Sequence, residues 1–137
     1  MAEIGPLLAA LKTSGQTISN LIVHDYQPDS IVTPCLILSL PAGDRIAEHD
    51  ATLDRASWWN FTALLLVSRV SDREAQYRLY EYLSTSGNKS IRNALETSRT
   101  LGGLAHVLLV DDPENWGEFT VGDTPYWGAE WNVRVLA

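Results

Sequence analysis

The sequence predicts an α+β fold, a single domain over residues 1–137 with about three helices on a mainly antiparallel or mixed sheet of about five or six strands. Three observations lead to this class. Apolar residues recur with a helical period at the N-terminus and around residue 80. The C-terminal third alternates apolar and polar residues, as an antiparallel strand does. The run 58–70 is apolar at both alternating sets of positions, which is typical of a central strand covered by helices or by another subunit.

The N-terminal half is expected to form one helix followed by three strands. An amphipathic helix opens the chain and ends near Gly15, and its apolar face at i, i+3, i+4 and i+7 consists of Ile4, Leu7, Leu8 and Leu11. The apolar runs 21–26 and 34–40 predict two strands, because turn-forming residues separate them. The polar segment 41–57 is long for a loop and is a candidate interaction arm, and the central strand 58–70 follows it.

Two further helices are expected in the middle of the chain. Ser71 and Glu74 have the spacing of a capping box, which predicts that the second helix begins there. Its apolar stripe consists of Ala75, Leu79, Tyr82 and Leu83. Gly87 is expected to supply the left-handed residue that ends this helix, and Ser90 is expected to cap a short third helix over residues 91–98.

The C-terminal third is expected to form three strands. Gly102 and Gly103 precede a strand over residues 104–110, and at least one of them is expected to have a positive φ. The runs 117–121 and 126–136 predict a β-hairpin, because the intervening residues include the turn-formers Gly, Asp and Pro.

Three short motifs lie in the predicted helical segment: YEYL at 80–83, SGNKSIRNAL at 86–95 and LGGL at 101–104. With these motifs, the order of elements resembles the tail terminator (tail completion) proteins of long-tailed bacteriophages, of the type found in phages of actinobacteria. The resemblance implies a virion structural protein without enzymatic activity. Such a protein caps the tail tube as a hexameric ring, ends tail elongation and provides the docking surface for the head connector.

The resemblance also implies partners and a location. The partners are further copies of the chain, the major tail tube protein and the head–tail connector protein, with no cofactor. The location is the tail–neck junction of the virion, after assembly in the cytoplasm of the bacterial host. A head-side neck protein, such as a head completion protein, stopper or adaptor, is the main alternative, and a small cytoplasmic enzyme is a further one.

Composition excludes several other classes. The net charge of −7 argues against a domain that grips nucleic acid, so DNA is expected only as a passing, non-bound genome. No apolar run approaches the length of a membrane span, so no membrane partner is expected. Cys35 is the only cysteine and lies in an apolar run, which predicts a buried residue rather than a catalytic thiol.

No motif for catalysis, metal binding or cofactor binding is readable. His24, His49 and His106 are scattered, and none lies at the spacing of a metal site. The segment 87–90 resembles part of a P-loop but lacks the required first glycine and the preceding strand. We therefore assign no catalytic, cofactor-binding or metal residue.

Charge is unevenly distributed along the chain. Basic residues gather in the helical segment, and acidic residues follow it. We hypothesise that these groups face each other across a subunit interface formed by Arg73, Arg78, Arg92, Arg99, Asp111, Asp112 and Glu114. The alternative is that they form solvated faces with i,i+4 pairs such as Glu74 with Arg78.

The tryptophans divide into two groups. Trp59 and Trp131 are in phase with apolar strand faces, so we expect them in the core. Trp58 and Trp116 lie out of phase at strand ends or turns, where large aromatic residues often anchor interfaces. These two are hypothesised partner anchors, and peripheral packing on the chain's own surface is the alternative.

Overall fold

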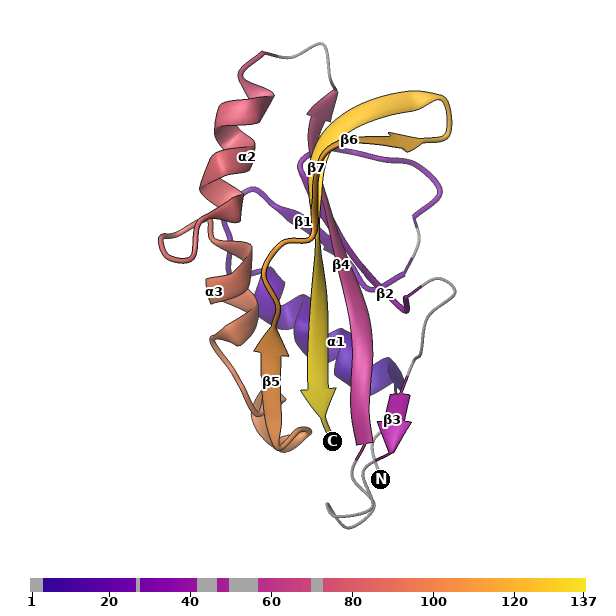
Figure 1. The fold of residues 1–137 in the computed structure, drawn as a ribbon, viewed down its shortest axis with the longest axis vertical. Helices are drawn as coiled ribbons and strands as arrows, with labels where there is room; N and C mark the ends of the chain where they lie inside the picture. The colour runs from indigo at the N-terminus through magenta and orange to yellow at the C-terminus, as the bar shows by residue number, and fades with distance from the viewer. Residues whose placement is uncertain (1–3, 27, 42–46, 50–56, 70–72) are drawn as a thin grey trace.

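The computed structural model describes residues 4–26, 28–41, 47–49, 57–69 and 73–137, and it confirms the predicted α+β class. In this part of the chain three α-helices cover one face of a mixed sheet (Figure 1). The helices are α1 (Ile4–Gly15), α2 (Ala75–Leu83) and α3 (Ile91–Glu96), and a short 3₁₀ turn spans Leu101–Gly103. The strands are β1 (Ile22–His24), β2 (Cys35–Ser39), β3 (Ala47–His49), β4 (Ser57–Arg69), β5 (Val107–Val110), β6 (Asn115–Val121) and β7 (Thr124–Leu136).

Strands β4 and β7 form the centre of the sheet, as predicted for the run 58–70. They pair antiparallel over almost their whole length, from Trp58 opposite Leu136 to Arg69 opposite Tyr126. On the other side of β4 lie β2 and the short β3, and β1 extends the sheet parallel to β2. Strands β5 and β6 pair with successive parts of the remaining edge of β7. The sheet is therefore mixed and mainly antiparallel.

The main core lies between the helices and one face of this sheet. Phe61, Leu65 and Trp131 face the helices and are almost completely buried. The predicted helical stripes are confirmed, because Leu7 and Leu11 of α1 are buried here together with Ala75, Leu79 and Tyr82 of α2. Burying these apolar side chains is the main source of stability for a domain of this size.

A smaller apolar cluster lies on the opposite face of the sheet, at the end where the β6–β7 hairpin bends. Its buried members are Cys35, Ile37, Leu66 and Tyr126. Phe119 and Val121 of β6 pack against it. The chain's own hairpin thus covers part of the second apolar face of β4, for which we had expected helices or another subunit.

The β6–β7 hairpin bends where Gly117, Gly128 and Leu66 lie side by side on three neighbouring strands. Gly117 of β6 lies directly opposite Gly128 of β7, and Gly128 lies opposite Leu66 of β4. At that level β4 contains a bulge between Leu66 and Ser68. A bulge and paired glycines both let a sheet curl, so the three strands bend together.

The ends of the second helix differ from the prediction. Helix α2 begins at Ala75, and Glu74 makes no side-chain capping hydrogen bond, while Ser71 lies outside the described residues. The helix ends at Leu83, because Ser84 is extended. Gly87 has a positive φ of 105°, but it lies in the turn before Ser90 and does not terminate α2. Gly87 therefore has the left-handed conformation that we expected, but the expectation that it ends α2 was wrong.

Three further expectations concern the segment 41–57, the glycines before β5 and the C-terminal hairpin. Most of the predicted loop 41–57 lies outside the described residues, but Ala47–His49 forms β3 against β4 and is therefore not part of a loop. The predicted positive φ before β5 is confirmed at both Gly102 (68°) and Gly103 (97°). The predicted hairpin of β6 and β7 is confirmed.

Candidate interaction surfaces

Two of the residues proposed to face each other across subunits contact each other within one chain. Arg92 Nη1 donates to Asp112 Oδ1 at 3.1 Å, and Arg92 Nε lies 3.4 Å from Glu96 Oε1. The other oxygen of Glu96 accepts a hydrogen bond from the backbone N–H of Val110 at 3.3 Å. This network ties α3 to the end of β5, so Arg92 and Asp112 pair inside the subunit and not, as hypothesised, with a neighbouring copy.

Asp111 is also held within the chain. Its two carboxylate oxygens accept hydrogen bonds from Arg134 Nη2 at 3.0 Å and from Asn132 Nδ2 at 3.2 Å. The guanidinium of Arg134 lies 5.8 Å from the centre of the Trp58 ring, within the range of a cation–π contact. Asp111 and Trp58 therefore both contact the Arg134 side chain of β7 within the subunit.

The remaining predicted interface residues lie at the surface. The side chains of Arg73, Arg99 and Glu114 are exposed, and Arg78 lies on the exposed side of α2. Their role in a subunit contact stays a prediction.

Two of the four tryptophans assigned from the sequence lie in the core as expected, and the anchor roles of Trp58 and Trp116 stay predictions. Trp131 is buried, and Trp59 is partly buried against the same core, which confirms both core assignments. Trp116 is 60% exposed on β6 and is available as a partner anchor. Trp58 is half-buried and stacks on Arg134, so it is a weaker candidate for an anchor than Trp116.

Sequence reasoning missed three exposed aromatic residues, which are Tyr26 after β1 and the pair Tyr77 and Tyr80 of α2. Tyr77 is 69% exposed and Tyr80 is 48% exposed. Their rings form an edge-to-face pair, with centroids 6.2 Å apart and planes at 88°. The signal was present in the sequence, because both tyrosines are out of phase with the buried stripe of α2.

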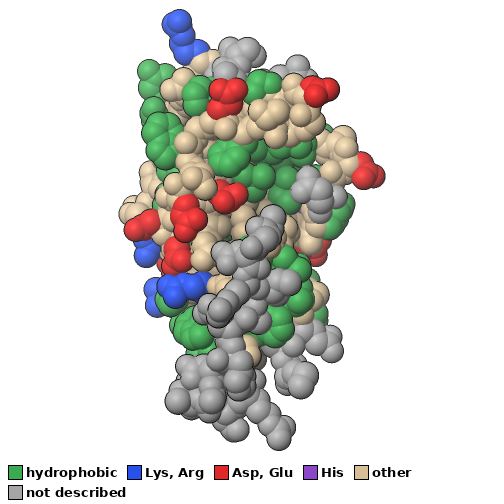
Figure 2. Space-filling view, turned by 45° about the vertical axis from the view of Figure 1, so that its right-hand side comes forward, with side chains coloured by type: hydrophobic (Ala, Val, Ile, Leu, Met, Phe, Trp, Pro, Cys, Tyr) green, Lys and Arg blue, Asp and Glu red, His purple; other side chains and the backbone are tan. Residues whose placement is uncertain are grey.

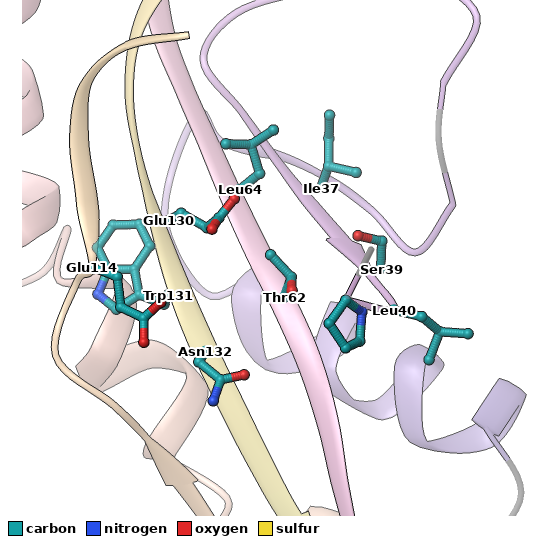
Figure 3. Close-up of a pocket in the computed structure, with 10 residues that line it drawn as sticks. Ile37, Ser39, Leu40, Thr62, Leu64, Glu114, Glu130, Trp131 and Asn132 are labelled. Atoms are coloured by element: carbon teal, nitrogen blue, oxygen red, sulfur yellow. The ribbon is translucent and has the colours of Figure 1, made fainter. Parts of the chain in front are cut away.

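A hollow of about 420 Å³ lies on the sheet face that the helices leave open. Figure 3 shows the residues around it, with Glu130 extending from β7 across β4 toward Leu64 and with Thr62 in the next row of the sheet. Ser39, Asn132 and Glu114 also line it. Figure 2 shows carboxylates at mid-height on this side of the molecule and hydrophobic side chains above them.

The hollow is rich in hydrogen-bond acceptors. Cross-strand register places Ile37, Leu64 and Glu130 in one row and Ser39, Thr62 and Asn132 in the next. The side chains therefore become more polar with distance from the bent hairpin. The carboxylates of Glu114 and Glu130 can accept hydrogen bonds from donors on a partner protein. None of the described residues that line the hollow is a histidine, cysteine or lysine.

Reactive side chains are either buried or dispersed in the described residues. Burial raises the pKa of the Cys35 thiol to about 11, so the thiolate that a nucleophile needs does not form near neutral pH. His24 packs edge-on against Tyr26, and His106 is exposed just before β5 rather than within the predicted strand. No group of three potential metal ligands occurs among the described residues. None of the described helices is long and apolar enough to cross a membrane.

Comparison with known proteins finds no match, either among protein-family models or among curated proteins. The tail terminator resemblance therefore stays a prediction.

Proposed function

We propose that this chain is a virion structural protein of the tail terminator type. It forms a ring on the end of the tail tube, ends tail elongation and presents the surface to which the head connector docks. The proposal is supported by the sequence resemblance and by the distribution of exposed aromatic residues.

The observation that carries the proposal is that large aromatic side chains are exposed on two separate elements. Tyr77 and Tyr80 project from α2, and Trp116 projects from β6. Aromatic side chains supply much of the binding energy of protein interfaces, because each removes a large apolar area from water on binding. Two such surfaces on one small domain suit a subunit that contacts a neighbour on either side.

The open sheet face suits the conduit that the proposal requires. Asp111, Glu114 and Glu130 lie on or beside this face, and only Asp111 is held by a described cation. Like charges repel, so a carboxylate surface lets DNA move past without binding. In this proposal the protein acts by binding other proteins, and the genome is not a ligand.

The proposal is tested by electron microscopy of a phage lysate that lacks this gene. A terminator occupies the growing end of the tube, so its loss should produce overlong tubes together with filled heads that have no tail. Tails of normal length with heads that leak DNA would support a head-side stopper instead. Complete infectious particles would exclude any role in virion assembly.

A complementation experiment connects the phenotype to the surface. Supplying a Trp116→Ala variant in trans should restore tail length only in part, because an interface aromatic contributes about 2 kcal/mol or more. Tyr26 is equally exposed at 60%, so a Tyr26→Ala variant is the matched control and should restore normal tails. Equal restoration by both variants would remove Trp116 from the assembly surface.

A further inference from the structure

We propose that β6 of one copy of this chain docks on the outer face of α2 of the next copy. This inference rests on the proposed function, because a ring needs one contact that repeats from subunit to subunit. It names the two surfaces that meet and the chemistry by which they recognise each other.

The first surface is a stripe formed by Tyr77 and Tyr80 of α2 and by Arg73, which lies in the turn just before this helix. These residues are at i, i+4 and i+7, and all three are exposed. At 100° per residue Tyr77 and Tyr80 lie about 160° and 100° around the helix from Leu79, and the other buried residues, Ala75 and Tyr82, lie on the opposite side of Leu79. The stripe therefore faces away from the sheet. Its two rings already contact each other edge to face, which limits the side-chain entropy lost on binding.

In the adjacent stripe of the helix, acidic and basic side chains alternate and can neutralise each other. This stripe consists of Glu74, Arg78 and Glu81, which alternate in sign at helical spacing. Glu81 also lies 3.6 Å from Lys89. The stripe of Arg73, Tyr77 and Tyr80 contains a cation and no carboxylate, so its best partner combines an aromatic ring with a carboxylate.

The second surface has that combination. Trp116, Glu118 and Thr120 alternate along β6, so their side chains share one face of the strand, and all three are exposed. The chain has no lysine or arginine between Asp111 and Val133, so no neighbour in sequence neutralises Glu118.

The spacing of the two surfaces also agrees. Two residues along a strand advance about 6.6 Å. The four-residue step from Tyr77 back to Arg73 advances about 6 Å on a helical path, which the αR backbone of Glu74 continues beyond the first residue of α2. Trp116 can therefore lie against Tyr77 and Tyr80 while Glu118 reaches Arg73. The contact joins aromatic rings at its centre with an ion pair at its rim, as in many protein interfaces.

The contact must form between two copies. The stripe on α2 faces away from the sheet, whereas β6 is part of the sheet, so the two surfaces of one chain cannot meet. In Figure 1 α2 and the tip of the β6–β7 hairpin lie near the same end of the long axis and on opposite sides. A contact between different surfaces on opposite sides is heterologous, and it closes into a ring when the rotation between copies allows.

Disulfide trapping tests the contact even if association in solution is weak. A Tyr77→Cys variant is mixed with a Trp116→Cys variant and oxidised, with Cys35 contributing no background because it is buried. Heterodimers should form faster than in a control mixture of Tyr26→Cys with Trp116→Cys, in which the new thiols replace equally exposed aromatic residues. Equal rates in the two mixtures would overturn the proposal.

A charge exchange tests the rim of the contact independently. In the same trapping assay an added Arg73→Glu change on the first partner should slow heterodimer formation, and Glu118→Arg on the second should restore it. Failure of the exchange to restore the rate would exclude the ion pair. Failure of the proposed function is distinguished by tail length in the lysate, which does not depend on which surfaces are trapped.

Discussion

Gly128 shows how a single residue controls the shape of the hairpin. A methyl group at this position would collide with the backbone carbonyl oxygen of Leu65 on β4 and lie 3.3 Å from the ring of Phe119. The carbonyl belongs to the central strand pair and cannot move without breaking that pairing. Position 128 therefore requires glycine because β7 and β4 leave no room for a side chain there. The backbone φ of Gly128 is not in the left-handed region, so conformation is not the reason.

We predict that Gly128→Ala lowers the free energy of unfolding by about 2 to 3 kcal/mol, the upper part of the range for overpacked positions. Urea denaturation measures the change. Gly5 has open space around its Cβ position and lies in α1, so Gly5→Ala is the control and should be neutral or slightly stabilising. Unchanged stability of Gly128→Ala would show that the hairpin can move away from β4.

Cys35 gives a second prediction for a single residue. Because the thiol is buried and its pKa is raised to about 11, iodoacetamide at pH 8 should leave the folded protein unlabelled. In denaturing urea the same reagent should label the residue rapidly. Mass spectrometry measures both, and rapid labelling of the folded protein would contradict the packing of the second apolar cluster.

At the scale of an element, the start of α3 depends on one side chain. Ser90 is almost fully buried, and its Oγ accepts a hydrogen bond from the N–H of Asn93 at 3.1 Å while donating to the carbonyl oxygen of Ser84. The serine thus caps α3 and holds the end of the preceding segment. Arg92, in the first turn of α3, then contacts Asp112 beyond β5.

Ser90→Ala should therefore destabilise the protein by about 1 to 2 kcal/mol, the upper part of the range for loss of a helix cap. Thermal and urea unfolding would both report the loss. Ser86 is exposed in the segment between α2 and α3, so Ser86→Ala is the matched control and should change stability little. A Ser90→Ala variant as stable as the control would mean that water replaces the cap.

Elements with a strong local signal were predictable from the sequence, and those that depend on distant partners were not. The spacing of the apolar residues predicted α1, and the Ser90 pattern predicted the start of α3, because both signals are local. Strand β3 was not predictable, since three polar or small residues become a strand only by pairing with β4. Tyr77 and Tyr80 could have been identified from the sequence, because both are out of phase with the apolar stripe predicted for α2.

The candidate site was partly predictable for the same reason. Trp116 was identified because it is out of phase with the apolar strand faces, and it is exposed. The partners of Arg92 and Asp111 were not identified, because an intrachain ion pair depends on which loops the fold brings together. Sequence alone shows that charges of opposite sign exist, and the topology decides whether they meet within one subunit.

At the scale of the whole molecule, the buried thiol and phenol predict how stability depends on pH. The pKa of Cys35 is raised by burial from 9.0 to about 11, and the pKa of Tyr82 is raised by burial and by Glu81. A raised pKa means that the folded state favours the neutral form. The resulting stabilisation is present below about pH 9 and is lost as the pH rises through about 11.

Urea midpoints measured from pH 7 to 11 should therefore fall on the alkaline side. The variants Cys35→Ala and Tyr82→Phe remove one titrating group each and should each make the decline less steep. If the urea midpoints of both variants fall with the same slope as those of the unmodified protein, the loss of stability comes from general charge repulsion in a chain that already carries a net charge of −7.

The pairing of β4 with β7 determines when the protein can fold during synthesis. The central ladder joins residues 58–69 to residues 126–136, so the sheet cannot close until β7 has left the ribosome. Until then β4 has no partner on one edge and both of its faces are apolar, which is the condition in which strands aggregate. During synthesis β4 therefore stays without its main partner for longer than a strand that pairs with its neighbour in sequence.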